Sequence, residues 1–442
     1  MNAPSRPMLL AALTLAAGAA FVGLRDRAPS YAGYASNTPI ALVPSLTGQP
    51  EYCLTCHEGI EEISPAHPAE VFGCVRCHGG QPLALDEQTA HAGLIGGRNP
   101  STFDTVEAAC GGTECHSGSS EDGLDHIHRS RTSLQATYAG AIAAVRFTFG
   151  AQPYPQALFA ISAVSDPDIT SPTGLPSLEA FLPVAADQPA RVREFASSCL
   201  TCHLDAEPID RPGFRRSAGC AACHSLANRG GTYTGGDPTI RRDETGHAAA
   251  HRLTTSIPYT QCNTCHNRGN YSLVDMTFHE RTDLPSDGMA ARLDAYYQPI
   301  AQFSACEYQL DCIDCHPSGE VMGDGDLHSR MDQVRTVECR TCHGTLTEGP
   351  RARRITDPED PALRQAHLNA SSRLDIGDTV VVTPHGESLW NVRQEQSGDF
   401  VLTGKVSGDT YAVPQVAGSA CEQDPGNQAS SACHECHSVQ RP

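Results

Sequence analysis

The pattern Cys-x-x-Cys-His, which occurs eight times in the 442 residues, carries the clearest chemistry in the sequence. Two intervening residues bring both thiols within reach of one porphyrin edge, where they can form thioethers with the vinyl groups, and the next residue can turn its imidazole under the iron. Chance placement of the 20 cysteines and 20 histidines would give about 0.04 copies. A structural zinc site does not require a histidine directly after a cysteine pair, whereas every Cys-x-x-Cys here is followed by one. We therefore predict covalent haem c at Cys53-Cys56-His57, Cys74-Cys77-His78, Cys199-Cys202-His203, Cys220-Cys223-His224, Cys262-Cys265-His266, Cys312-Cys315-His316, Cys339-Cys342-His343 and Cys433-Cys436-His437.

A ninth candidate, Cys110-Gly-Gly-Thr-Glu-Cys115-His116, has four residues between its cysteines. Its two glycines would let the longer loop fold back and bring the second thiol beside the first. The competing interpretation is a cysteine pair near an unrelated histidine. Beside eight regular copies we favour a ninth haem, and we number the motifs 1 to 9 in chain order, so that this one is motif 3.

Nine motifs use 18 of the 20 cysteines and leave Cys306 and Cys421. In an oxidising compartment these two could pair with each other, although nothing in the sequence shows that they are close.

Eleven histidines remain after the nine motif histidines, which is enough to close the second face of every iron. An iron with an imidazole on both faces has no open position for a substrate. Four of these histidines lie 12 or 13 residues after a motif histidine, as His91 does after His78, which predicts a repeated unit that returns a distal ligand to its own haem or to a neighbour. His247 and His251 have the spacing of a zinc hydrolase helix, but Ala248 stands where that motif needs glutamate. The predicted distal ligands are His67, His91, His126, His128, His247, His251, His279, His328, His367 and His385, whereas His434 either serves an adjacent haem or faces solvent.

The composition fits a chain with few apolar side chains of its own. Only 39% of residues are hydrophobic and 6% are aromatic, so side chains alone make a thin core. The formal charge of −20 argues against binding to a phosphate backbone and therefore against a nucleic-acid partner. An apolar run from Met8 to Leu24 predicts an export signal or a short membrane anchor. Either one places the rest of the chain outside the cytoplasm, in the periplasm, on the outer face of the membrane or in the extracellular space.

The spacing of the motifs divides the chain into six segments. We expect a signal or anchor at 1–35, a three-haem region at 36–150, a haem-free linker at 151–198, a five-haem region at 199–350, a haem-free segment with strands at 351–432 and a last haem site at 433–442. The predicted fold is mostly α and irregular and packed around haems, with a small antiparallel β segment near the C-terminus.

Several elements can be placed on this layout. An apolar-periodic stretch predicts a helix from about Leu124 to Phe149, with Asp122 or Asp125 near its start, and residues 150–190 have the composition of a loop. Asp360 and Pro361 predict the cap and first turn of a short helix that carries His367. Three strands are expected at DTVVVT, FVLTGKV and TYAVPQV, with His385 and Trp390 in the connection between the first two. This β segment is a docking surface, a lid over the ninth haem or a spacer.

The chain resembles the multihaem c-type cytochromes, most closely in the paired motifs CLTCH to CVRCHGG and DCIDCH to CRTCHG. The resemblance implies close haem packing and electron transfer. Enzymes of this class keep one haem open, and nitrite reductases typically use Cys-x-x-Cys-Lys there, a motif that this sequence lacks. No catalytic residue is predicted.

The resemblance favours an electron conduit between a membrane donor and an extracytoplasmic acceptor, such as a redox partner protein. The alternatives are an oxidoreductase of a small nitrogen or sulfur species with one five-coordinate haem, and a self-associating subunit of a cytochrome filament.

Overall fold

The computed structural model describes residues 38–119, 124–182, 188–200, 203–207, 215–228, 230–262, 264–265, 270–272, 277–279, 309–369, 371, 373–421, 433 and 437. In these residues irregular backbone outweighs helix and strand together, and no helix is long and apolar enough to cross a membrane. The irregular character and the small antiparallel sheet predicted from the sequence are confirmed, but helices are fewer and shorter than "mostly α" implies. The predicted signal or anchor, Cys306 and His434 lie outside the described residues.

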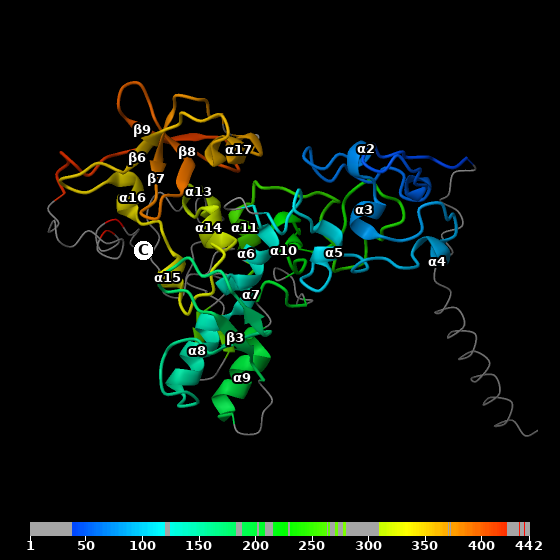
Figure 1. Ribbon diagram of the computed structural model, residues 1–442, viewed down its shortest axis with the longest axis horizontal. Coiled ribbons are helices and arrows are strands. Elements are labelled where there is room, and N and C mark those ends of the chain that lie inside the picture. Colours follow the sequence, from blue (N-terminus) through cyan, green and yellow to red (C-terminus); the bar gives the residue numbers. More distant parts are fainter. Residues whose placement is uncertain are drawn as a thin grey trace, which may run out of the picture.

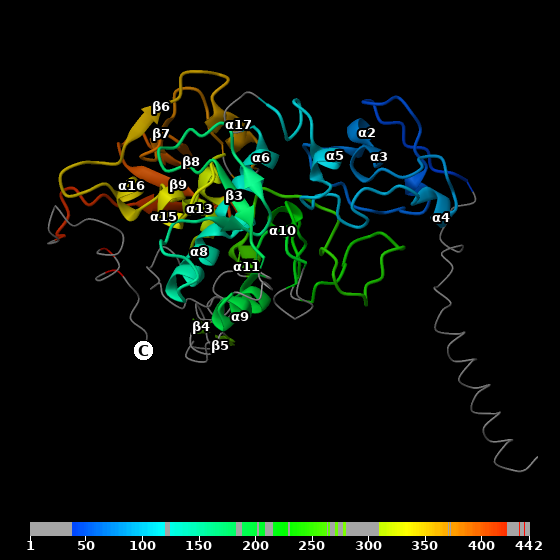
Figure 2. The same cartoon turned by 60° about the horizontal axis from the view of Figure 1, so that its bottom comes forward.

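Residues 38–119 form one end of the molecule, which Figures 1 and 2 draw in blue and cyan. Each helix here is a single turn or little more, and three of them contain motif residues. Only Val106 and Ala109 are buried apolar residues in this segment. The helical elements are η2 (Cys53–Thr55), α2 (Ala69–Phe72), α3 (Val75–His78), α4 (Glu87–Ala90) and α5 (Val106–Cys110).

The helix predicted from Leu124 to Phe149 is broken into three pieces, α6 (His126–Thr132), α7 (Leu134–Thr137) and α8 (Ala139–Thr148). Asp125 caps α6, as predicted, by accepting a bond from the His128 N–H. Ser133 interrupts the helix with an extended backbone, because its hydroxyl accepts from the Ala136 N–H and so caps α7. Tyr138 then takes a left-handed conformation, with φ of 56°, and begins α8 in a new direction.

A small lobe, seen below the other elements in Figure 1, surrounds α8. The expectation of a loop at 150–190 is wrong in part, because β1 (Phe159–Ala160), β2 (Val164–Ser165) and β3 (Ser177–Ala180) form a sheet in the order β1-β3-β2. One face of α8 packs on this sheet, and the other packs on α9 (Ala190–Cys199). These strands are too short to give a period-two pattern that sequence analysis could detect.

The remaining single-turn helices lie near the motifs of the second half of the chain. They are α10 (Ala221–His224), α11 (Tyr259–Cys262), α13 (Cys312–Cys315), α14 (Ser318–Val321), α15 (Met331–Val334) and α16 (Cys339–His343). A two-stranded sheet, β4 (Asn270–Ser272) and β5 (Thr277–His279), lies between α11 and α13 in the sequence.

The end opposite to residues 38–119 holds an antiparallel sheet of five strands in sequential order (Figure 1). The strands are β6 (Ala352–Arg354), β7 (Thr379–Val382), β8 (Ser388–Gln394), β9 (Phe400–Thr403) and β10 (Thr410–Val413). The three predicted strands correspond to β7, β9 and β10. The placement of Trp390 in a connection is wrong, because it lies within β8, whereas His385 does lie in the turn between β7 and β8.

The sheet buries apolar side chains on both faces. Val380 and Val381 are neighbours in β7 and therefore point to opposite faces of the sheet. Val380 and Trp390 pack with Ala362 and Ala366 of α17 (Pro361–His367), while Val381 packs with Val392, Phe400 and Leu402. The predicted cap of α17 is confirmed, because the Asp360 carboxylate accepts from the Ala362 N–H at 2.9 Å. The same carboxylate pairs with both terminal nitrogens of Arg353 on β6.

We predict that Asp360→Ala loosens the contact between α17 and the sheet by about 1 to 2 kcal/mol, because it removes a helix cap and leaves Arg353 without its carboxylate. Bonding to Arg353 lowers the pKa of Asp360. The contribution is therefore complete above the ordinary pKa of an aspartate and is lost as the pH falls through the folded pKa. Hydrogen exchange across 352–394 measures the change. Glu359→Ala removes a neighbouring exposed carboxylate and should leave exchange unaltered, and equal effects of the two substitutions would contradict the assignment.

Candidate haem-attachment sites

In four of the Cys-x-x-Cys-His motifs, a backbone hydrogen bond closes the turn from the histidine N–H to the carbonyl of the first cysteine. The N–O distances are 3.1, 2.9, 3.1 and 2.9 Å in motifs 1, 2, 5 and 7. This i to i+4 bond winds the motif into a single helical turn, so the thiols and the imidazole project from one short segment. The local sequence thus builds the arrangement that thioether attachment and axial ligation both need.

Motif 3 reaches the same closure with two more residues. The His116 N–H donates to the Cys110 carbonyl at 3.2 Å, and the Cys115 N–H donates to the Gly112 carbonyl at 2.8 Å. Gly112 has φ of 126°, a conformation that side chains rarely allow. The extra residues are therefore absorbed in a tight loop, as its glycines predict.

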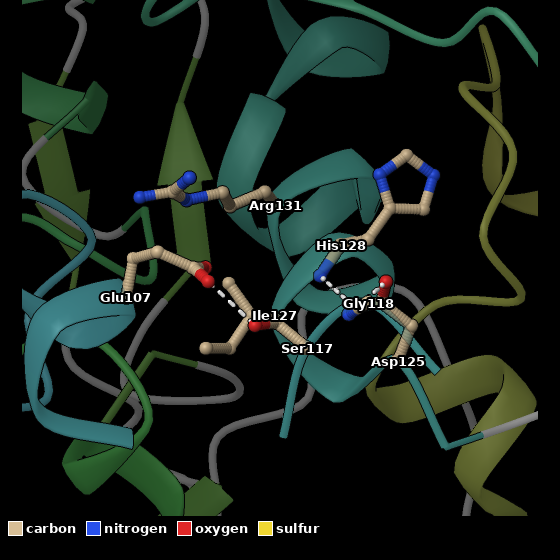
Figure 3. A pocket seen from close by; sticks show the side chains of 7 residues that line it. All are labelled: Glu107, Ser117, Gly118, Asp125, Ile127, His128 and Arg131. Carbon is tan, nitrogen blue, oxygen red and sulfur yellow. Dashed lines mark hydrogen bonds between the residues drawn. The ribbon is translucent and has the colours of Figure 1, made fainter. Parts of the chain in front are cut away.

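Polar side chains fix the chain on both sides of this loop. Ser117 donates to the Glu107 carboxylate at 2.5 Å, and the Asp125 carboxylate accepts from the backbone N–H groups of Gly118 and His128. These residues line a cavity of about 270 Å³ (Figure 3). Because both carboxylates hold the loop in place, the cavity is better described as part of the scaffold of motif 3 than as a substrate pocket.

Three motif histidines in the first half of the chain lie against other histidines. Ring centroids are 6.1 Å apart for His57 and His91, 6.0 Å for His78 and His251, and 5.8 Å for His116 and His67. A second ring, that of His126, lies 5.5 Å from His116. An iron that binds two imidazoles on opposite faces holds their centroids about 6 Å apart, since each metal–nitrogen bond is about 2 Å and each centroid lies about 1 Å behind its nitrogen. The observed separations therefore fit one iron between each pair.

None of these three pairs joins a motif histidine to the histidine 12 or 13 residues after it, although His91 lies against the neighbouring motif 1, which is one of the two arrangements that the spacing predicts. His91 lies against motif 1 rather than motif 2, which it follows, and His251 reaches motif 2 from 173 positions further along the chain. His67, which has no counterpart in the second half of the chain, lies against motif 3. At motifs 2 and 3 the neighbouring ring therefore belongs to another segment of the chain, His251 at motif 2 and His67 at motif 3.

Other predicted distal histidines have different neighbours. His328 is buried and uses both ring nitrogens, with Asp324 at 3.0 Å from Nε2 and Thr173 at 3.4 Å from Nδ1. Nε2 of His128 lies 3.8 Å from the Asp166 carboxylate, and that of His247 lies 3.4 Å from Arg98. His367 and His385 are exposed, and only the backbone of His279 is described. None of these is brought against a motif histidine within the described residues.

Several histidines that lie in motifs or in ring pairs are oriented by a hydrogen bond at Nδ1. In six of them Nδ1 hydrogen-bonds to an oxygen of the protein, which leaves Nε2 for a metal. The partners are Asp237 Oδ2 for His57 (2.7 Å), Ser64 Oγ for His67 (3.0 Å), Thr254 O for His224 (2.8 Å), Glu61 O for His251 (3.0 Å), Glu320 Oε2 for His316 (2.5 Å) and Pro414 O for His343 (2.7 Å).

Two of these partners, Asp237 and Glu320, are carboxylates with no exposed surface. Burial raises the pKa of each carboxyl group, but hydrogen bonds outweigh it and the pKa of both remains below the ordinary value. Each is held in place by other donors. Thr239 bonds Asp237 through its N–H and hydroxyl, and the Thr336 and Val337 N–H groups bond Glu320. Such carboxylates fix the ring and increase the basicity of the imidazole.

Two further histidines have a buried nitrogen without a protein partner in the described residues, namely Nδ1 of His126 and Nδ1 of His203. Burial lowers the pKa of both, and that of His78, to about 4. All three are therefore neutral at pH 7, which is the form that binds metals.

Neighbouring motifs touch along the molecule. The Cys53 and Cys74 thiols lie within 4.8 Å of each other. Cys312 raises the pKa of Cys262, and burial together with Cys339 raises the pKa of Cys433. Arg76 of motif 2 donates to the carbonyls of Ala109 and Gly111 beside motif 3. Gln261, beside motif 6, donates to the Ala222 carbonyl of motif 5 at 2.6 Å. Burial and, after it, the Cys110 thiol of motif 3 raise the pKa of Cys220 in motif 5. Motif 4 joins this row at motif 5, because Arg216 donates to the carbonyl of His203 and the Gly219 N–H donates to that of Leu204.

The Cys53 and Cys74 thiols also lie within 4.8 Å of the Glu51 carboxylate, a group that could hold a metal ion. Glu51, however, accepts from the N–H groups of Cys74 and Val75 and so caps the turn of motif 2. Since both thiols belong to haem-attachment motifs, we regard Glu51 as a positioning residue.

The five-stranded sheet holds motifs 7 and 8, a role that the sequence did not reveal. Asn391 donates to the Asp314 carbonyl, and the Lys405 N–H donates to the Asp314 carboxylate. After β10, Gln415 donates to the Cys342 carbonyl and the Val416 N–H donates to that of His343. The sheet is thus a clamp on these two motifs within the described structure.

Sequence analysis missed the Nδ1 partners. Glu320 stands four residues after His316, a spacing that could have suggested it, whereas Asp237 lies 180 residues from His57 and nothing in the sequence links them. Of the motif residues, Cys202, His266 and Cys436 lie outside the described residues.

Comparison of the chain with family models, with curated proteins and with solved structures yields no match.

We predict that Asp237→Asn makes the reduction potential of one haem more positive in the haem-loaded chain that the motifs predict. The carboxylate strengthens electron donation from His57 and stabilises the ferric state, and an amide does so less. A spectroelectrochemical titration measures the shift. Asp243→Asn, which removes an exposed carboxylate of the same segment, is the control. Identical titration curves for wild type and Asp237→Asn would contradict the role of Asp237.

Proposed function

We propose that the chain is a multihaem c-type cytochrome that conducts electrons between a membrane donor and an extracytoplasmic acceptor. The observation that carries the proposal is the pairing of three motif histidines with other histidines at ring separations of 5.8 to 6.1 Å. An iron bound between two imidazoles would hold their ring centroids at about this separation.

The shortage of apolar core supports the same proposal. Residues 38–119 hold three motifs but only two buried apolar residues, and all four apolar clusters lie elsewhere in the described chain. A segment of this size needs an interior to fold. Three haems would provide it, and they would also supply one-electron exchange.

The protein's own residues have three tasks under this proposal. The motif turns fix the attachment points, the Nδ1 partners orient the ligating imidazoles, and His91, His251 and His67 are assigned as the distal ligands of motifs 1, 2 and 3. The ring of His126 also lies against that of His116, so His126 is a second candidate ligand for motif 3. The contacts between neighbouring motifs support an arrangement of haems along the molecule, with motif 4 joined at motif 5. Such an arrangement suits transfer along the molecule better than chemistry at one centre.

The haem content tests the proposal directly. We expect the mass of the protein secreted by a host with cytochrome c maturation to include nine haems, and Cys110→Ala with Cys115→Ala to include eight. Cys421→Ala, which changes a cysteine outside the motifs, should retain all nine. An unchanged haem count in the double variant would remove motif 3 from the set, and a protein without covalent haem would refute the whole proposal.

Electron paramagnetic resonance of the oxidised protein separates a conduit from an enzyme. We expect only low-spin ferric haem, because a conduit has two imidazoles on every iron, and the described residues supply the second ring at three motifs. A high-spin signal from one haem that shifts on addition of nitrite, hydroxylamine or sulfite would instead support an oxidoreductase. That outcome would make the remaining haems the path that feeds the reaction.

A further inference from the structure

Lys405 is the single lysine in the sequence, and it is buried against the single tryptophan, Trp390. All other basic side chains, apart from histidine, are arginines. Lysine is almost never fully buried unless it is paired, and here no carboxylate lies within ion-pair distance of its amine in the described residues. A buried amine in this position requires an explanation beyond packing.

The contacts of Lys405 hold the amine in one place. Nζ donates to the Ile313 carbonyl at 2.6 Å and lies 4.9 Å from the centroid of the Trp390 ring. The backbone N–H of Lys405 donates to the Asp314 carboxylate, also at 2.6 Å. A carbonyl oxygen and an aromatic face both favour a cation.

The amine carries a charge at neutral pH. Burial lowers the pKa of Lys405 to about 8, while Asp314, Cys315, Glu387 and Cys342 act in the opposite direction. The group is therefore mostly protonated at pH 7, in surroundings where a charge acts strongly on its neighbours.

The position of the amine relates it to two motifs at once. Ile313 lies between the two cysteines of motif 7, so the carbonyl that receives the bond belongs to the motif itself. Cys342 of motif 8 packs on the sheet that carries Trp390, and Gln415, just after the last strand of that sheet, donates to the Cys342 carbonyl. The amine therefore contacts motif 7 directly, and the sheet that holds the amine also holds motif 8.

We propose that Lys405 is a fixed positive charge that raises the reduction potentials of the haems at motifs 7 and 8, so that electrons in the row rest preferentially on this pair. This inference depends on the proposed function. Reduction adds one electron to a haem, and a cation nearby stabilises the reduced state with no proton or ligand exchanged. Lys405 therefore acts on the haems through its charge and is not an iron ligand.

The test is a spectroelectrochemical titration of the haem-loaded protein with Lys405→Met, which removes the charge and retains much of the side chain. We expect two haems to shift to lower potential and the others to stay where they are. Lys405→Arg retains the charge and should restore the wild-type titration. Mass spectrometry of each variant must show the full haem complement, which separates failure of this inference from failure of the proposed function.

Three results would overturn the inference. One is an unchanged titration in Lys405→Met with all haems attached. Another is a low potential in Lys405→Arg equal to that of Lys405→Met, which would assign the effect to packing. The third is a new high-spin signal in Lys405→Met, which would make Lys405 an axial ligand.

A second variant applies if Lys405→Met does not fold. Glu387→Gln removes a negative charge that acts on the same amine and keeps an oxygen for its bonds with Ser318 and Gly319. It should shift the same two haems in the opposite direction, to higher potential. No shift, or a shift spread evenly over all haems, would also contradict the inference.

Discussion

The hydrogen bond from the motif histidine back to the first cysteine carbonyl is the interaction on which the other features depend. It forms at similar length whether two or four residues separate the cysteines, as the 3.1 Å bond of motif 1 and the 3.2 Å bond of motif 3 show. Because this bond fixes where the imidazole begins, a single acceptor at Nδ1 is enough to fix where its other nitrogen points. The ring pairs at about 6 Å can then form between segments that are distant in sequence.

In the described residues the apolar cores are built mainly from the stretches that separate the groups of motifs. These cores lie around α8 and on the two faces of the five-stranded sheet, and they include or contact the motif residues Cys199 and Cys342. Residues 38–119, in contrast, are held by polar contacts such as those of Glu51 and Arg76, each of which supports a motif turn. On the proposed function, folding of this end and attachment of its cofactors are one process.

The sequence predicted the residues that carry chemistry better than it predicted their partners. The motifs, the cap at Asp360 and three strands of the large sheet all follow from local rules, namely fixed spacing, a capping side chain and alternating apolar residues. The predicted long helix failed at Ser133 and Tyr138, where a hydroxyl cap and a left-handed residue outweighed the apolar period. The pairing of His251 with His78 and of Asp237 with His57 could not be predicted, because each joins segments separated by more than 170 residues. Tertiary packing alone determines such contacts.

The Nδ1 partners and Lys405 together imply that the row of sites is not uniform. His57 and His316 bond to buried carboxylates, which would stabilise a bound ferric iron, whereas His224 and His343 bond to backbone carbonyls, which would do so less. At motif 7 the carboxylate of Glu320 opposes the cation of Lys405, but at motif 8 the cation acts beside a carbonyl alone. On the proposed function, motif 1 would therefore lie toward the low-potential end and motif 8 toward the high-potential end. Electrons that enter near residues 38–119 would then move toward the five-stranded sheet. The sheet, which holds motifs 7 and 8, would thus serve electron transfer as well as the fold.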